Sequence, residues 1–138
     1  VHDAVRCCLQ QQDIDKLLKE VADNRQGGLL ALPVRDTMKR QMEDSIPAAV
    51  AKTVERDNLW HALTPQYFPA YNLKVALETA QQKGLDITDE SSAMELAGFS
   101  PKLVHGQVDN IKITRPDDLR LAGLYLQAQQ SQESKHHE

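Results

Sequence analysis

Lys112 is the side chain for which the sequence offers the most chemistry. It lies between Ile111 and Ile113, so a strand with a period of two would turn both isoleucines to one face and the ammonium group to the other. Pro116 then stands where the first turn of a helix favours proline. Ligands of open α/β sheets bind beyond the carboxyl ends of the strands, which would place Lys112 near an anion site. The alternative is a solvated lysine on a strand face, and composition alone favours that alternative.

Asp3 is the second candidate for chemistry. It follows a strand-like opening at the start of the chain, and Mg²⁺ prefers one or two carboxylates together with substrate phosphates. An aspartate that only hydrogen-bonds to a loop backbone is an equal alternative. Asp3 is therefore a candidate ligand for a divalent cation.

Other cations and hydroxyls could bind a phosphate. Most lysines and arginines of such a chain are surface groups, while Thr64 suits a turn and Thr88 a helix cap. His61 and His105 fit packing or surface positions better than catalytic ones, and no spacing indicates a Ser, His and Asp triad. The remaining candidates are Arg6, Arg35, Thr37, Lys39, Arg40, Arg56, Thr64 and Thr88.

The composition is that of a globular chain. The 138 residues carry a formal net charge of −4 and are 41% hydrophobic. No apolar run approaches the roughly 18 residues of a membrane-spanning helix, and no signal-peptide pattern occurs, so we expect a cytoplasmic protein without a membrane partner. Lys and Arg are scattered among more acids, which argues against nucleic acid as a partner. Cys7 and Cys8 lack the spacing of a zinc site and are expected to be small, buried or half-buried thiols.

The elements that would position these residues alternate between strands and helices, which predicts an α/β fold with a single domain through residue 128. Asp13 and Thr88 stand where the N-caps of two helices are expected. The aromatic segment 59–69 is expected to pack against the sheet edge and to turn at its prolines. The predicted helices cover 13–22, 73–80, 88–97 and 116–126, and the predicted strands cover 29–34, 103–106 and 109–113.

Residues 35–57 have the pattern of an exposed ribbon. Segments 35–41 and 49–55 alternate like two solvated strands, joined by a turn at Pro47. An isolated ribbon is marginally stable in water, so we expect this β-arm to pack on a second subunit. Residues 129–138 are expected to form a polar, frayed tail.

The chain begins at Val1 without methionine, in what has the pattern of the end of a strand. We therefore expect a fragment from which an N-terminal part is absent. Neither a GxGxxG nor a GxxxxGK[ST] loop occurs, so a phosphate cradle for a nucleotide would lie outside these residues.

Five separated segments, in this order, resemble one enzyme family over nearly the whole chain. They are VHDAVR, LALPVRDTMKR, TVERDNLWHALTPQYF, ITDESSAMELAGF and DNIKITRPDDLRLA. Together they resemble the C-terminal part of the 2-C-methyl-D-erythritol 4-phosphate cytidylyltransferases of non-mevalonate isoprenoid biosynthesis. The glycine-rich nucleotide loop of that family has no counterpart in this sequence.

The resemblance implies a Rossmann-like nucleotidyltransferase sheet with helices on both faces and a β-arm that clasps a second subunit in a homodimer. It implies transfer of a cytidylyl group from CTP to methylerythritol phosphate, with Mg²⁺ as the cofactor. It further implies that Arg56 and Lys112 position the attacking phosphate and that Asp3 serves the metal and the substrate. Ala4 would approach the nucleotide through its backbone. Further substrate contacts are implied for Arg6, Thr37, Thr64 and Thr88.

Two other interpretations stay open at this point. A related enzyme that acts on another polyol phosphate, such as ribitol phosphate, would share the fold and the TPQ segment. The chain could also be an inactive fragment that dimerises through its arm without binding CTP.

Overall fold

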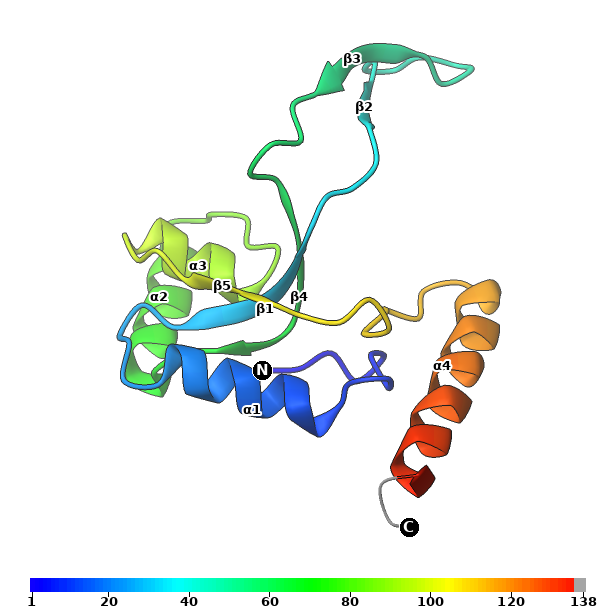
Figure 1. The fold of residues 1–138 in the computed structure, drawn as a ribbon. Coiled ribbons are helices and arrows are strands. Elements are labelled where there is room, and N and C mark those ends of the chain that lie inside the picture. The colour runs from blue at the N-terminus through cyan, green and yellow to red at the C-terminus, as the bar shows by residue number, and fades with distance from the viewer. Residues whose placement is uncertain (136–138) are drawn as a thin grey trace.

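The computed structural model describes residues 1–135, which form a three-stranded sheet, a separate two-stranded ribbon and four helices (Figure 1). The elements in chain order are α1 (Gln11–Val21), β1 (Gly28–Pro33), β2 (Met38–Gln41), β3 (Val50–Val54), β4 (Trp60–Tyr67), α2 (Ala70–Gln82), α3 (Glu90–Leu96), β5 (Lys102–His105) and α4 (Pro116–Lys135). The predicted α/β class is confirmed.

β1 is the central strand because its backbone is paired on both sides. It runs antiparallel to β4, with Gly28 opposite Tyr67, and parallel to β5, with Gly28 opposite Lys102. The apolar run of β1 suits this position, since residues 29–31 are buried and a strand covered on both faces has no polar side. The strand predicted at 29–34 is confirmed.

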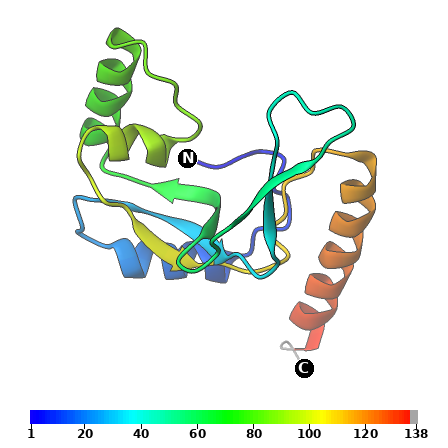
Figure 2. The same ribbon diagram turned by 90° about the horizontal axis from the view of Figure 1, so that it is seen from above.

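Helices lie on both faces of this sheet (Figures 1 and 2). Side chains of a strand alternate between the two faces of the sheet. α1 packs on the side chains of one face and α3 lies on the other face. A core between α1 and the sheet consists of Leu17, Val21, Leu30, Leu63 and Val104. The other face carries Leu29, Ala62 and Leu103, which line a pocket with Ser91 and Glu95 of α3. A second core joins α2 to α3 and consists of Phe68, Ala76, Ala93 and Met94.

β2 and β3 form a ribbon, here called the arm, which projects from the body of the molecule (Figure 1). Lys39 lies opposite Thr53, and its Nζ donates a hydrogen bond of 2.7 Å to the Thr53 hydroxyl. At the base of the arm, the Val34 amide donates to the Leu59 carbonyl at 2.9 Å, which extends the pairing of β1 with β4. The arm is therefore the outer end of a hairpin whose inner end belongs to the sheet.

The prediction of a strand around Lys112 is wrong. Residues 109–114 lie in no strand. The Ile113 amide donates to the Val5 carbonyl at 3.1 Å, and Arg6 Nη1 donates to the Asn110 carbonyl at 2.8 Å. The N-terminal loop therefore supplies hydrogen bonds that a neighbouring strand would otherwise supply.

The aromatic segment was predicted only in part. Most of it is the strand β4, but the chain does enter a helix after Pro69 as expected. Pro65 lies inside this strand, where the register with β1 shifts between Leu29 and Ala31, and an irregular ladder tolerates a residue without an N–H group. Leu63 and Phe68 are buried as expected, but Tyr67 is 42% exposed because it points away from the core.

Both predicted N-caps are one or more residues away from the observed ones. The N-cap of α1 is Gln10, whose amide donates to Asp13 Oδ2 at 3.3 Å, so Asp13 lies in the first turn. The N-cap of α3 is Asp89 rather than Thr88, and Asp89 Oδ1 accepts from the Ser92 amide at 2.8 Å. In each case a carboxylate still satisfies an amide at the helix start.

α4 is longer than predicted and includes most of the expected polar tail. Gln129 explains part of this, because its Nε2 donates to Asp109 Oδ2 at 2.7 Å and to the Cys8 carbonyl at 2.9 Å. Residues 136–138, the end of the predicted tail, lie outside the described residues. Within residues 1–135, no helix combines the length and the hydrophobicity needed to cross a bilayer.

Candidate active site

The site begins where the N-terminal loop meets β4. Val1 and Gln66 exchange two backbone hydrogen bonds, of 2.7 and 2.9 Å, in the manner of an antiparallel pair. Two residues further on, the Asp3 amide donates to the Thr64 hydroxyl at 3.0 Å. These bonds hold Asp3 beside Thr64, in the middle of β4.

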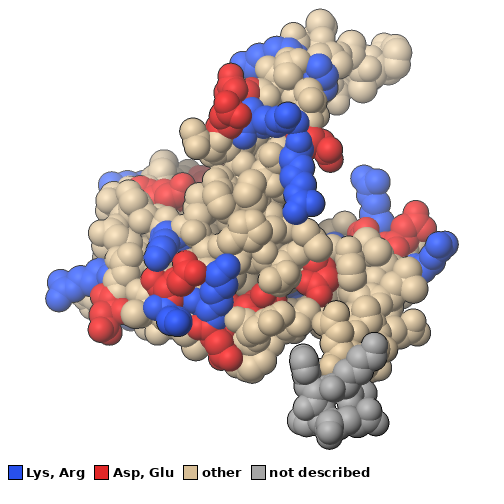
Figure 3. Space-filling model, viewed as in Figure 1, with Lys and Arg blue, Asp and Glu red and all other residues tan. Residues whose placement is uncertain are grey.

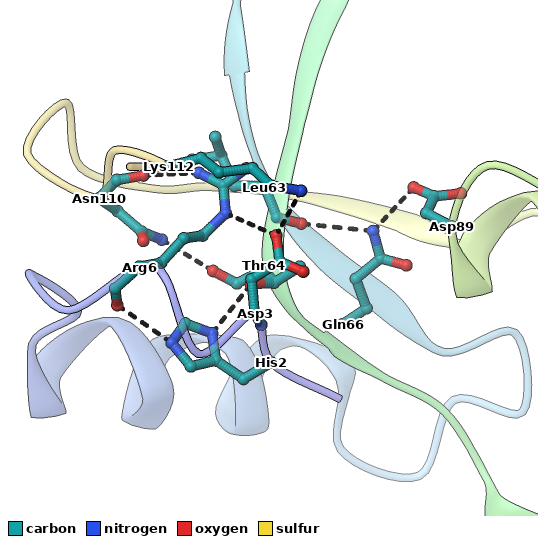
Figure 4. Close-up of polar contacts among 9 residues, drawn as sticks. All are labelled: His2, Asp3, Arg6, Leu63, Thr64, Gln66, Asp89, Asn110 and Lys112. Atoms are coloured by element: carbon teal, nitrogen blue, oxygen red, sulfur yellow. Dashed lines mark hydrogen bonds and ion pairs between the residues drawn. The ribbon is translucent and has the colours of Figure 1, made fainter. Parts of the chain in front are cut away.

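Two cationic side chains meet at the Asp3 carboxylate (Figure 4). Its Oδ2 accepts from Arg6 Nε at 3.2 Å and lies 3.4 Å from Lys112 Nζ. Burial alone would raise the pKa of Asp3, but the Arg6 hydrogen bond and the Lys112 charge outweigh burial and lower that pKa below its ordinary value. Asp3 is therefore ionised at neutral pH.

The two cations differ in their exposure to solvent. The Arg6 side chain is 8% exposed, and its Nη1 donates to the Asn110 carbonyl at 2.8 Å. The Lys112 side chain is 50% exposed. Arg6 thus orients Asp3 and joins two loops, while Lys112 keeps an ammonium group that a ligand can reach.

His2 and Thr64 complete the inner network. His2 Nε2 lies 3.2 Å from the Arg6 carbonyl, and Nδ1 lies 2.9 Å from the Thr64 hydroxyl. Because a carbonyl only accepts, Nε2 of a neutral imidazole donates and Nδ1 accepts the hydroxyl proton. The Thr64 hydroxyl then accepts from Asp3 and donates to His2, which fixes its direction.

These groups line a pocket with a volume of ≈ 390 Å³. The N-terminal loop and β4 form one wall, and residues 88–90 at the start of α3 form another. Its lining consists of Asp3, Arg6, Ala62, Leu63, Thr64, Gln66, Thr88, Asp89, Glu90 and Lys112. Such a mixture of cations, hydroxyls and carboxylates can bind a phosphorylated polyol, with cations on the phosphate and polar groups on the hydroxyls.

Five residues predicted from the sequence as site residues come together in this pocket. They are Asp3, Arg6, Thr64, Thr88 and Lys112. Thr37 and Arg56 lie instead in a second pocket, of ≈ 360 Å³, at the arm, where the Arg56 guanidinium donates to the Arg35 carbonyl. Ala4 is exposed on the loop and does not line either pocket.

The buried amides that hold the pocket together were not among the residues predicted from the sequence. Asn110 is 1% exposed, and its Nδ2 donates to the Thr64 carbonyl at 2.8 Å. Gln66 is 2% exposed and connects β4 to α3. The position of Gln66 inside the aromatic segment 59–69 could have indicated a structural role. A glutamine that is buried with such a segment is normally hydrogen-bonded.

Charge is mixed over the rest of the surface. In Figure 3, Lys and Arg side chains alternate with Asp and Glu on both the body and the arm. Cys7 is exposed and Cys8 is buried, with their Sγ atoms 3.9 Å apart. The cysteine prediction therefore holds for Cys8 but not for Cys7.

Two solved structures have the same fold. A crystal structure of 4-diphosphocytidyl-2C-methyl-D-erythritol synthase matches with a TM-score of 0.80 and 40% identity, covering 91% of this chain and 55% of that chain. The Francisella tularensis 2-C-methyl-D-erythritol 4-phosphate cytidylyltransferase matches with a TM-score of 0.82 and 36% identity, covering 91% and 57%. Fold and pocket together place the chain in the α/β class, with the fold of these two structures.

Sequence comparison gives the particular family. The profile of the family described as IspD, 2-C-methyl-D-erythritol 4-phosphate cytidylyltransferase, matches residues 1–128. The chain belongs to this family. A cytidylyltransferase of this name from Shewanella amazonensis is 59% identical over 130 residues, which are 94% of this chain and 53% of the relative. One from Citrobacter koseri is 56% identical over 126 residues, covering 91% and 54%. The chain thus spans about half the length of the curated relatives it matches.

Proposed function

We propose that this chain carries the polyol-phosphate half of an active site that transfers a cytidylyl group from CTP to 2-C-methyl-D-erythritol 4-phosphate, as a step in isoprenoid biosynthesis in the cytoplasm. The observation that carries this proposal is the meeting of Asp3, Arg6 and Lys112 in one pocket. Membership of the IspD family supports the choice of substrates.

The reaction joins two polyanions, so its barrier is largely electrostatic. An oxygen of the methylerythritol phosphate attacks the α-phosphorus of CTP, a new P–O bond forms, and the bond to the β-phosphate breaks as pyrophosphate leaves. The protein has to bring both phosphates together in line and offset their mutual repulsion.

Lys112 has the role of holding the attacking phosphate. Its side chain is half exposed and its ammonium group is oriented by Asp3 at 3.4 Å, so a bound phosphate gains a partner whose position is already set. Thr88 lies on the opposite wall and offers a hydroxyl. Arg6 and Thr64 act mainly by fixing Asp3, since both make hydrogen bonds to it. Ala4 has the role of a backbone contact to the nucleotide.

Arg56 and Thr37 have their role in a homodimer. Both lie at the arm, in a pocket separate from that of Lys112. We propose that the arm of one subunit delivers Arg56 and Thr37 to the Lys112 pocket of its partner, so that the complete phosphate site contains residues of two chains. Loss of the dimer would then remove activity together with stability.

Mg²⁺ is the expected cofactor, and Asp3 is the residue that would hold it. Within residues 1–135, no group of three or more His, Cys, Asp and Glu side chains is arranged to bind a metal. The ionised Asp3 fits the pattern in which Mg²⁺ takes one or two carboxylates and completes its shell with phosphate oxygens and water. When bound, such an ion neutralises charge on the triphosphate.

Isothermal titration of the chain with methylerythritol phosphate, ribitol phosphate, and CTP with Mg²⁺ tests this proposal. We expect methylerythritol phosphate to bind at least tenfold more tightly than ribitol phosphate. Tighter binding of ribitol phosphate would assign the chain to the related polyol. Failure of both polyol phosphates to bind would contradict the proposal and favour an inactive fragment. Release of pyrophosphate with all substrates present reports turnover.

A further inference from the structure

Gln66 makes more contacts than a strand residue needs for packing. Its side chain is buried, at 2% exposure. Its Nε2 donates to Asp89 Oδ2 at 2.8 Å and to the Leu63 carbonyl at 3.3 Å (Figure 4). Its Oε1 accepts from the Ser91 amide at 2.8 Å. One amide thus connects β4 with two residues at the α3 start, Asp89 and Ser91.

The bond to Asp89 controls where a negative charge points. Asp89 lines the same pocket as Lys112. Its Oδ2 accepts from Gln66 and its Oδ1 accepts from the Ser92 amide at 2.8 Å. Both carboxylate oxygens are therefore engaged at the start of α3. A carboxylate released from these bonds could turn toward a bound phosphate and repel it.

Glutamine is suited to this position because it donates and accepts at once. Asp89 requires a donor and the Ser91 amide requires an acceptor, and a neutral amide provides both without adding charge. The Gln66 backbone also pairs with Val1, two residues before Asp3. Gln66 therefore connects both walls of the pocket.

We infer that Gln66 is a positioning residue of the phosphate pocket, which fixes residues 88–90 relative to β4 and keeps the Asp89 carboxylate turned away from the bound phosphate. The inference rests on the proposed function for the identity of the ligand. Its structural part, the anchoring of the α3 start, is independent of any ligand.

Two substitutions separate anchoring from charge orientation. Gln66→Met removes the donor and the acceptor while it keeps the length of the side chain. Gln66→Glu keeps an acceptor for the Ser91 amide but loses the donor to Asp89 and places a second carboxylate beside it. Gln129→Met is the matched control. The side-chain amide of Gln129 also donates two hydrogen bonds, to Asp109 and to the Cys8 carbonyl, but it lies outside the pocket.

Two measurements on the full chain at pH 8 read out the two effects. Amide hydrogen exchange at Ser91 is expected to become at least tenfold faster in Gln66→Met and to stay within threefold of the wild type in Gln66→Glu. Titration with methylerythritol phosphate is expected to show at least tenfold weaker binding for both variants, since each loses a hydrogen bond to a charged group. Gln129→Met is expected to bind within twofold of the wild type.

The outcomes distinguish this inference from the proposed function. If the wild type does not bind methylerythritol phosphate, the proposed function fails, and unchanged Ser91 exchange in Gln66→Met would still overturn the anchoring. If the wild type binds and Gln66→Glu binds within twofold of it, the role in charge orientation is wrong. Should Gln66→Met fail to fold, as judged by circular dichroism, the binding result for Gln66→Glu decides.

Discussion

Replacing Lys112 with methionine should separate ligand binding from stability. Lys112 pairs with Asp3 at 3.4 Å, but half of its side chain is exposed. Exposed ion pairs contribute about 0–1 kcal/mol, so we expect the melting temperature to fall by no more than about 4 °C. A charge-assisted hydrogen bond to a phosphate is worth about 1.5–3 kcal/mol. Binding of methylerythritol phosphate should therefore weaken roughly tenfold to a hundredfold.

Lys102→Met is the matched control for this substitution. Lys102 is 46% exposed and lies 3.7 Å from Glu20, so it resembles Lys112 in exposure and pairing but lies outside the pocket. We expect the same small loss of stability and no change in affinity. Lys112→Arg should restore part of the binding, because it keeps the charge with a different geometry.

Arg6→Met should show the opposite result to Lys112→Met, with a larger loss of stability than of ligand affinity. It leaves the Asn110 carbonyl without its buried donor and removes a charged partner from Asp3, at a cost of about 2–4 kcal/mol. Thermal melting and calorimetric titration of all four variants give the comparison. A loss of stability in Lys112→Met as large as that in Arg6→Met, or an unchanged affinity, would refute the assignment of Lys112 to the ligand.

Three further outcomes follow from other parts of the chain. Burial raises the pKa of Asp13, so ionisation of Asp13 opposes folding, and stability is lost as the pH rises through the folded-state pKa. Asp13→Asn should therefore raise the free energy of unfolding, measured in denaturant at neutral pH. At about pH 3, where the aspartic acid is protonated, the substitution should have no effect. Gly27 has φ +72°, and an added Cβ would lie 2.1 Å from Phe68, so Gly27→Ala should cost about 2–5 kcal/mol. Gly84→Ala, at φ +62° in open space, should cost only about 1 kcal/mol, and equal melting temperatures of the two variants would contradict the role of the contact. If the complete enzyme is the dimer proposed above, Arg56→Ala should lower its pyrophosphate release by at least about a hundredfold with no change in sedimentation. Near-normal kinetics would exclude Arg56 from the phosphate site.

Local sequence patterns predicted those elements whose hydrogen bonds or burial are local or repetitive. The continuous apolar run at 29–34 became the central strand β1, and the alternating polar segments became β2 and β3. The alternation around Lys112 misled for a physical reason. The hydrogen-bond partners of this segment are Val5 and Arg6, more than 100 residues earlier in the chain. A local sequence pattern cannot indicate partners that are so distant.

Three charged side chains of the pocket were predicted from the sequence as site residues, whereas the amides that support them were not; the role of the three in binding stays a prediction. Resemblance to the family indicated Asp3, Arg6 and Lys112, which the fold brings within hydrogen-bond or ion-pair distance. Asn110 and Gln66 could not be assigned from spacing, because Asn110 contacts a carbonyl 46 residues away and Gln66 contacts a helix that starts 24 residues later. Their burial is a property of the assembled fold.

The continuity between the arm and the sheet has a consequence for protein engineering and for natural variation. Because the chain leaves through β1 and returns through β4, residues added at the distal turn near Ser45 would not shift the pairing of Val34 with Leu59 at its root. Doubling the length of a flexible connection costs only about 0.6 kcal/mol. An epitope or a fluorescent label could therefore be inserted at that turn while the pocket behind β4 keeps its shape.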